Sequence, residues 1–288
     1  MATVSDDAPY HDTIINRDCS HMRELPDESI DLIISGPPYW SFIDYSAFTE
    51  GRPYLWQSDE SYEDYLAQLK RWHQECFRVL RPGRFCMVVL GTLERDGSNY
   101  PIPFDAIPLL KSIGFNFRYE IVWNKISGGR QSARNFLKSP KIRRFRPNNR
   151  TEYILVCQKP ARHFAGELWP HISAISLPDE GFFSREIANN IWNIPSARGR
   201  AAGSHPCPFP LELPARLIEL FSAEKETVLD PFLGSGTTAV AARLLGRYFI
   251  GYEREIGFCQ LAEQRVSNAT RSKAANRRSR VTAKFVTL

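Results

Sequence analysis

Short apolar runs that alternate with helical patterns constrain the fold of this chain more than any other feature. The apolar runs end in turn residues and predict buried strands at residues 13–15, 31–34, 85–90, 119–123, 153–156, 227–229 and 248–251. Helical periodicity occurs between several of them, at residues 62–80, 107–113, 213–221 and 237–245. Strands and helices that alternate in this way predict an α/β fold with a doubly wound, mostly parallel sheet.

Two stretches interrupt this alternation and are predicted to be loops or a small insert. They are residues 126–150 and residues 161–203, the second of which carries several prolines and many polar residues. The remaining chain, with 43% hydrophobic residues in a total of 288, can supply the core of one large domain.

The first interrupting stretch is rich in basic residues and contains no acidic residue. Its candidate phosphate contacts are Arg130, Arg134, Lys138, Lys141, Arg143, Arg144 and Arg146. The tail from residue 267 onward is likewise basic without acids, whereas the formal net charge of the whole chain is only +5. The distribution of charge therefore indicates an anionic partner. We expect at least half of these side chains to neutralise phosphate and not to read bases.

The six cysteines form no CxxC pair and have no matching histidine pairs, so neither a zinc site nor a disulfide framework is expected. Free thiols are typical of a reducing cytoplasm. No apolar run reaches the roughly 18 residues of a membrane span. Asp6 and Asp7 stand where a signal peptide would be basic and then apolar. We expect a cytoplasmic protein with no metal and no membrane partner.

A glycine-rich turn follows the strand predicted at residues 227–229. The strand end and the turn offer candidate ligand contacts at Asp230, Phe232, Gly234, Gly236, Thr237 and Thr238. Such a turn lets backbone N–H groups and a helix N-terminus approach a ligand closely. The next predicted strand ends near Glu253, whose carboxylate can accept hydrogen bonds from ribose hydroxyls. The combination favours a nucleoside ligand over a tight turn that binds nothing.

Two prolines and two aromatic residues end the strand predicted at residues 31–34. The sequence there is Ser35, Gly36, Pro37, Pro38, Tyr39 and Trp40. Prolines at a strand end leave backbone carbonyls unpaired, and these can accept hydrogen bonds from an amino group. An adjacent aromatic ring can stack on a base. Alone, Pro-Pro-Tyr more often marks a turn with a packed tyrosine, but beside the glycine turn it indicates chemistry on an extruded nucleotide.

Together these motifs resemble those of the DNA amino-methyltransferases, in the β arrangement that places Pro-Pro-Tyr before the cofactor glycine motif. The resemblance covers nearly all of residues 14–266. It implies a circularly permuted Rossmann-like fold, S-adenosylmethionine as cofactor and double-stranded DNA as substrate. The segment with Asp18 and Cys19 resembles the one whose acid contacts the cofactor's adenine. The stretch that ends at Pro210 resembles the one that closes over its methionine end.

The resemblance also implies an organisation of the chain. Its predicted parts are a catalytic half (10–125), a basic DNA-recognition insert (126–150), a core strand (151–160), a variable insert (161–189), a cofactor-binding half (190–266) and a basic tail (267–288).

Gly36 departs from the family pattern. Members usually carry Asp, Asn or Ser just before Pro-Pro-Tyr, which gives the target amino group a side-chain acceptor, whereas Gly36 offers only its backbone carbonyl. Ser35 should point to the opposite face of a regular strand. Three interpretations stay open: the carbonyls of Gly36 and Pro37 suffice, another group supplies the second acceptor, or the enzyme is slow.

The resemblance implies direct attack of an exocyclic amino nitrogen on the sulfonium methyl group. Residues 35–39 are the candidate catalytic segment, with Tyr39 stacking on the base. Trp40 and the His-Pro-Cys-Pro-Phe-Pro stretch favour cytosine N4 as the target, and adenine N6 is the alternative. Cys207 after Pro206 raises the rival interpretation of a cytosine C5 enzyme, which would not need Pro-Pro-Tyr.

Two interpretations from other classes are a catalytically silent protein that binds cofactor and DNA, and an RNA or protein amino-methyltransferase. Family habit makes a homodimer and a cognate restriction endonuclease the expected partners.

Overall fold

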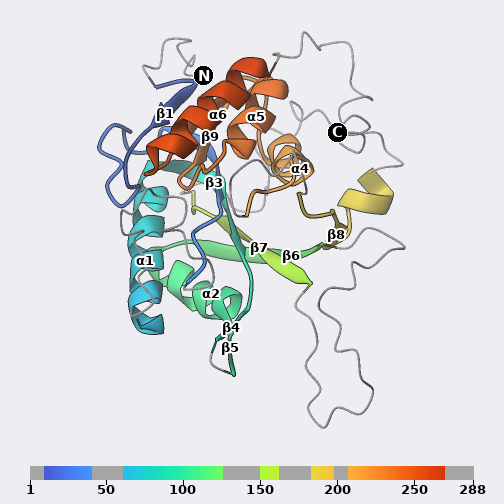
Figure 1. Ribbon diagram of the computed structural model, residues 1–288. Coiled ribbons are helices and arrows are strands. Elements are labelled where there is room, and N and C mark those ends of the chain that lie inside the picture. Colours follow the sequence, from blue (N-terminus) through green and yellow to red (C-terminus); the bar gives the residue numbers. More distant parts are fainter. Residues whose placement is uncertain are drawn as a thin grey trace.

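A computed structural model describes residues 10–40, 61–95, 97–125, 150–161, 183–197 and 207–269. Within these residues the chain forms a central eight-stranded sheet with helices packed on both faces (Figure 1). The strands of this sheet are β1 (Thr13–Ile15), β2 (Ile30–Ser35), β3 (Leu80–Leu90), β6 (Asn116–Asn124), β7 (Thr151–Gln158), β8 (Ile191–Asn193), β9 (Thr227–Asp230) and β10 (Tyr248–Tyr252). A separate hairpin pairs β4 (Leu93–Arg95) with β5 (Ser98–Tyr100).

The strand order is β1-β10-β9-β2-β3-β7-β6-β8. The five strands from β1 to β3 run parallel to one another, β7 is antiparallel to both of its neighbours, and β8 is parallel to β6. The late strands β9 and β10 therefore lie between the early strands β1 and β2. This insertion of C-terminal strands among N-terminal ones is the permuted, mostly parallel α/β arrangement that the sequence predicts.

The helices are α1 (Tyr62–Val79), α2 (Ile102–Ile113), α4 (Glu212–Phe221), α5 (Thr237–Leu244) and α6 (Ile256–Asn268), with a short π-helix η4 (Phe183–Ile187). Strand β3 shows how they divide between the two faces. Phe85 and Met87 pack into the core with α4, α5 and α6, whereas Cys86 and Val88 pack into the core with α1 and α2. Because successive side chains of a strand point to opposite faces, a central apolar strand needs a cover on both.

The predicted strands are confirmed, and the predicted helices are confirmed with shifted ends. Helix α2 begins at Ile102, before the predicted residue 107, because Pro101 and Pro103 lie at its first turn, where a missing N–H costs no hydrogen bond. Helix α6, the β4–β5 hairpin and β8 were not predicted. Strand β8 falls within a stretch expected to be a loop, and its register with β6 pairs Trp123 with Trp192.

None of the helices in the described ranges has the length and apolar character needed to cross a membrane.

Candidate active site

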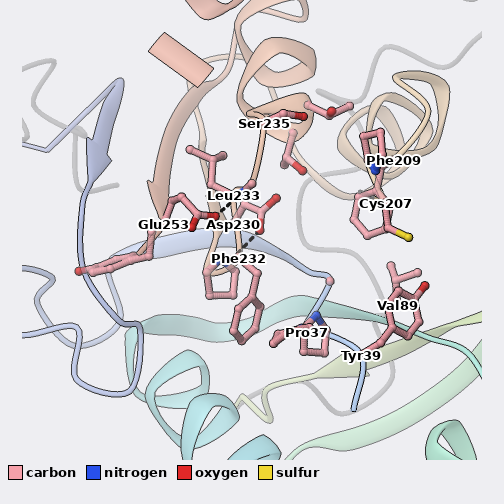
Figure 2. A pocket seen from close by; sticks show the side chains of 18 of the residues that line it. Pro37, Tyr39, Val89, Cys207, Phe209, Asp230, Phe232, Leu233, Ser235 and Glu253 are labelled. Atoms are coloured by element: carbon pink, nitrogen blue, oxygen red, sulfur yellow. Dashed lines mark hydrogen bonds between the residues drawn. The ribbon is translucent and has the colours of Figure 1, made fainter. Parts of the chain in front are cut away.

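One cavity opens along the edge of the sheet at which β1, β2, β9 and β10 end. Parallel strands bring their carboxyl ends to the same edge, so residues far apart in sequence meet there. Figure 2 shows Asp230 and Glu253 on one side of this cavity and Tyr39 on the other, with Pro37 and Phe232 between them. The glycine turn and the Pro-Pro-Tyr segment therefore face a common space.

Most of the predicted site residues line this cavity: Asp18, Cys19, Gly36, Pro37, Pro38, Tyr39, Asp230, Phe232, Gly234, Thr237, Thr238 and Glu253. Ser35, Pro210 and Gly236 do not line it.

The turn after β9 is held by two carboxylates, one at the end of β9 and one that follows β10. Asp230 accepts a hydrogen bond from the backbone N–H of Phe232 at 2.9 Å, and Glu253 accepts one from that of Gly234 at 2.9 Å. A second bond to Glu253 comes from the backbone N–H of Glu255 at 2.8 Å. Burial raises the pKa of Asp230 to about 6 and that of Glu253 to about 7, because a low-dielectric site disfavours the charged form.

Gly236 shapes the turn without reaching the cavity. It has a φ of +81°, and a Cβ atom there would lie 2.7 Å from Cβ of Ala262 on α6. The position therefore requires glycine both for its backbone conformation and for the close approach of α6.

The end of β1 adds a polar residue and a small apolar one. Oδ1 of Asp18 accepts a hydrogen bond from the backbone N–H of Ser20 at 2.7 Å. Cys19 is buried, and burial raises the pKa of its thiol well above the usual value, so this thiol stays neutral. Cys19 thus acts as a small lining side chain.

The Pro-Pro-Tyr segment ends in a hydrogen-bonded cluster. Tyr39 donates its hydroxyl to Oε1 of Glu152 at 2.5 Å, and Nζ of Lys125 forms an ion pair with the same oxygen. The carbonyl of Pro38 accepts from the hydroxyl of Tyr65 at 3.2 Å.

Trp40, by contrast, is buried and does not line the cavity. Its ring contacts Tyr62 and Tyr100, and the guanidinium of Arg95 lies 4.8 Å from its centroid.

Ser35 faces α1 and contributes to the fold. His73 Nδ1 lies 2.7 Å from the carbonyl of Leu69, an acceptor, so Nδ1 must carry the ring proton. Nε2 then accepts from the Ser35 hydroxyl at 3.1 Å. Burial lowers the pKa of His73 to about 4, which keeps this ring neutral. The Ser35 side chain is therefore committed to His73 of α1 and does not line the cavity.

The ring of Phe209 lies against position 36, so a side chain there would require this ring to move. A Cβ atom on Gly36 would lie 2.4 Å from Cζ of Phe209, inside its ring's contact distance. Phe209, Pro208 and Cys207 line the cavity, although the neighbouring Pro210 does not. The loop before α4 thus closes one wall of the site by packing an aromatic ring over the Gly36 backbone.

Several lining residues were missed by sequence reasoning. They are Arg17, Trp72, Val89, Trp123, Lys125, Glu152 and Phe209. Glu152 falls in the predicted core strand at residues 151–160, with no role attached. Phe209 falls in the stretch ending at Pro210 that resembles the segment closing over the cofactor.

Cys207 is a poor nucleophile in this environment. Desolvation by its surroundings and then the negative charge of Glu152 raise the pKa of its thiol. A cytosine C5 mechanism requires a reactive thiolate, which the raised pKa of Cys207 disfavours.

The predicted DNA contacts Arg130, Arg134, Lys138, Lys141, Arg143, Arg144 and Arg146 lie outside the described residues.

Comparison with known proteins places these features in a family. The family model for N6/N4 DNA methylases matches residues 30–264. Among curated proteins, the chain is 29% identical to the type II methyltransferase M.BglII of Bacillus subtilis over 269 residues, covering 88% of this chain and 68% of that protein. It is 30% identical to the type II methyltransferase M.MthZI of Methanothermobacter thermautotrophicus over 287 residues, covering 87% and 75%.

Solved structures agree with this match. A DNA modification methylase from Thermus thermophilus, solved with S-adenosyl-L-methionine, superposes with a TM-score of 0.67 at 28% identity, covering 90% of this chain and 96% of that one. The fold is also that of the cytosine-N4-specific PvuII DNA methyltransferase, at a TM-score of 0.66, 19% identity and coverages of 88% and 85%. The chain belongs to the family of N6/N4 DNA methylases, enzymes that methylate exocyclic amino groups of DNA bases.

Proposed function

We propose that this chain transfers the methyl group of S-adenosylmethionine to N4 of a cytosine turned out of double-stranded DNA, with adenine N6 as the alternative target. The observation that carries the proposal is one cavity lined by both the Pro-Pro-Tyr segment and the carboxylates of Asp230 and Glu253. Direct transfer requires both reactants to reach each other in a shared, water-poor site.

The side of the cavity formed by β1, β9 and β10 fits S-adenosylmethionine. In this proposal Glu253 and Asp18 accept hydrogen bonds from the ribose hydroxyls and the adenine, and the backbone at Gly234 approaches the ligand closely, which their position in the cavity lining supports. Asp230 adds negative charge that complements a sulfonium cation. When bound, the cofactor supplies an electrophilic methyl group. No metal or covalent enzyme intermediate is needed.

The opposite side of the cavity fits a base. An exocyclic amino nitrogen is a weak nucleophile because its lone pair is delocalised into the ring, so the site must orient it and accept its protons. In this proposal the carbonyls of Gly36 and Pro37 accept from the amino group and Tyr39 stacks on the ring, which the position of all three residues in the cavity lining supports.

The preference for cytosine rests on family resemblance. Phe209, which belongs to the stretch that carries this resemblance, lies against Gly36 and lines the cavity. The Pro-Cys-Pro-Phe-Pro stretch and Trp40 resemble the corresponding residues of cytosine-N4 members. Trp40 is buried in the core of this protein.

The basic segment at residues 126–150 is the proposed DNA contact, since it is the longest run of positive charge without acids. A homodimer and a cognate restriction endonuclease are the proposed partners. Sedimentation of the protein alone and with duplex DNA tests the dimer.

The decisive experiment identifies the methylated nucleoside. Purified protein is incubated with methyl-labelled S-adenosylmethionine and mixed-sequence duplex DNA, the DNA is digested, and labelled nucleosides are separated by chromatography. We expect N4-methylcytosine. N6-methyladenine would reverse the base assignment and keep the mechanism, whereas 5-methylcytosine would overturn the mechanism. Cofactor binding with no transfer to DNA, measured by calorimetry, would support a silent binder or a non-DNA substrate.

A further inference from the structure

The active site lacks a side-chain acceptor where one is expected. Gly36 has no side chain, and the ring of Phe209 occupies the space that one would fill. The Ser35 hydroxyl is bound to His73 of α1 and does not line the cavity. Backbone carbonyls alone would have to orient the amino group, and they are poor proton acceptors compared with a carboxylate.

Glu152 places a carboxylate at the same wall of the cavity. It lies at the start of β7, the strand that runs antiparallel to its neighbours, so its N-terminal end meets the carboxyl ends of the others. Its residue is 4% exposed and lines the cavity beside Tyr39 and Pro37. Gly91 makes room for it, because a Cβ there would lie 3.2 Å from Cγ of Glu152.

The two oxygens of Glu152 have different surroundings. Oε1 accepts from the Tyr39 hydroxyl and pairs with Lys125, which orients the carboxylate and offsets part of the cost of burying its charge. Oε2 is buried and has no hydrogen-bond partner among the residues that the structure describes. A buried acceptor left without a donor costs about 1–3 kcal/mol, and more when charged. A bound ligand with an N–H donor would remove that cost.

We infer that Oε2 of Glu152 accepts a proton of the target amino group and so takes the place of the side chain that Gly36 lacks. The inference rests on the proposed transfer to an exocyclic amino group, and it applies equally to cytosine and adenine.

The transfer step balances in protons and electrons. The amino nitrogen forms its bond to the methyl carbon with its own lone pair, and the electron pair of the broken carbon–sulfur bond stays on sulfur. The cationic nitrogen then gives one proton to Oε2 of Glu152, which holds it as a neutral carboxylic acid. Lys125 and Tyr39 keep the carboxylate aimed at the nitrogen throughout.

The test compares Glu152→Gln with the intact chain. Glutamine keeps the size and can still accept from Tyr39, but it presents an N–H group or a weaker acceptor to the amino group. We expect the single-turnover rate of methyl transfer, with enzyme in excess over mixed-sequence duplex DNA and saturating S-adenosylmethionine, to fall about 100-fold or more. The cofactor's dissociation constant by calorimetry should change less than about threefold. The matched control is Glu120→Gln on β6, a carboxylate outside the cavity, which should keep the rate.

A rescue variant separates proton acceptance from support of the fold. In the Glu152→Gln background, Phe209→Ala makes room for Gly36→Ser, which restores a hydroxyl acceptor before Pro-Pro-Tyr. We expect this triple variant to transfer methyl groups about tenfold faster than Glu152→Gln with Phe209→Ala alone, because one hydrogen bond to a developing charge contributes about 1.4 kcal/mol or more.

Each outcome decides the matter. A rate loss with unchanged cofactor affinity, followed by rescue, supports the assignment. Glu152→Gln that transfers methyl groups at nearly the intact rate overturns it. A rate loss accompanied by a lower melting temperature, weaker cofactor binding and no rescue assigns Glu152 a structural role and also overturns it. If the intact chain itself methylates no amino group in DNA, the proposed function fails first and the assignment falls with it.

Discussion

Two buried carboxylates lie on the side of the cavity that is proposed to bind the cofactor. Asp230 and Glu253 both have pKa values raised by burial, to about 6 and about 7. In the free protein each is therefore partly protonated near neutral pH. A ligand that donates hydroxyl hydrogen bonds and carries positive charge favours the ionised form, so its binding must release protons in this pH range.

Affinity for S-adenosylmethionine should therefore depend on pH. Because the bound state favours the carboxylate, affinity should rise as pH rises from about 6 to about 8, by up to tenfold per unit below the pKa of Glu253. Glu253→Gln should weaken binding at pH 8 by about 10- to 100-fold, equivalent to about 1.4–3 kcal/mol. In Glu253→Gln the affinity should keep only a weaker dependence on pH, near pH 6, which Asp230 produces.

Calorimetric titration at several pH values measures both effects. Glu263→Gln, an exposed carboxylate on α6, is the matched control and should bind like the intact chain. A pH-independent affinity in the intact chain would remove Glu253 from the cofactor site.

Helix α6 packs against the glycine turn that follows β9. Arg265 donates to the carbonyl of Ser235 at 2.5 Å and to its hydroxyl at 2.7 Å, and Ala262 lies against Gly236. The turn is thus fixed by a helix that never reaches the cavity. Its contribution to binding comes from holding the backbone N–H groups in place before the ligand arrives.

Gly236→Ala should disturb this contact. The new Cβ would lie 2.7 Å from Cβ and 3.0 Å from Cα of Ala262, and the left-handed φ adds backbone strain. We expect a loss of about 2–4 kcal/mol in the free energy of unfolding and weaker cofactor binding. The control is Gly246→Ala, which shares a positive φ of +74° but meets its nearest atom at 3.9 Å.

Gly246→Ala should cost only the conformational part, about 1–2 kcal/mol, and spare the cofactor affinity. Urea unfolding and calorimetry on both variants make the comparison. Equal effects of the two substitutions on cofactor affinity would show that α6 does not position the turn.

The two edges of the sheet have different roles in the whole molecule. The carboxyl edge holds the cavity, and the opposite edge is joined by ion pairs. Asp31, which is 2% exposed at the start of β2, accepts from the backbone N–H of Thr227 at 2.9 Å and pairs with Arg81. It lies 3.6 Å from Arg84, which also pairs with Glu226. These contacts join β2, β3 and β9 across the permuted order of the chain.

Asp31→Asn should therefore reduce stability without changing the site. The substitution removes the negative charge that pairs with Arg81 and Arg84. Because both arginines are partly exposed, we expect a loss of about 2–3 kcal/mol in the free energy of unfolding. The cofactor's dissociation constant should stay the same, because Asp31 lies at the far end of β2. Equilibrium unfolding in urea with and without cofactor tests this, and unchanged stability would show that hydration replaces the pair.

Local sequence patterns predicted most of the architecture because each buried strand and helix carries its own periodicity. The strand at residues 31–34 and the glycine turn at Gly234 could be recognised without the fold. Helix α6 was missed because its apolar face is short, with Phe258, Cys259, Ala262 and Val266 buried. Strand β8 was missed because its three residues are too few to show an alternation of apolar and polar side chains. They form a strand by pairing with β6.

Lining residues that belong to one continuous motif were predicted from the sequence. Lining residues that come from separate elements were missed. The Pro-Pro-Tyr segment, the glycine turn and Glu253 each occupy one strand end, so sequence order shows them. Lys125, Glu152 and Phe209 come from separate elements, and no local pattern shows that they meet at Tyr39 and Gly36.

The sequence by itself determined the α/β class, the family motifs and the odd glycine at position 36. Only the tertiary structure decided that Ser35 binds His73, that Phe209 covers Gly36, and that Glu152 lines the cavity with one buried oxygen that has no described partner. The physical reason is that motifs depend on backbone conformation over a few residues. Hydrogen-bond partners and steric exclusion depend on side chains that the sheet topology brings together from distant parts of the chain.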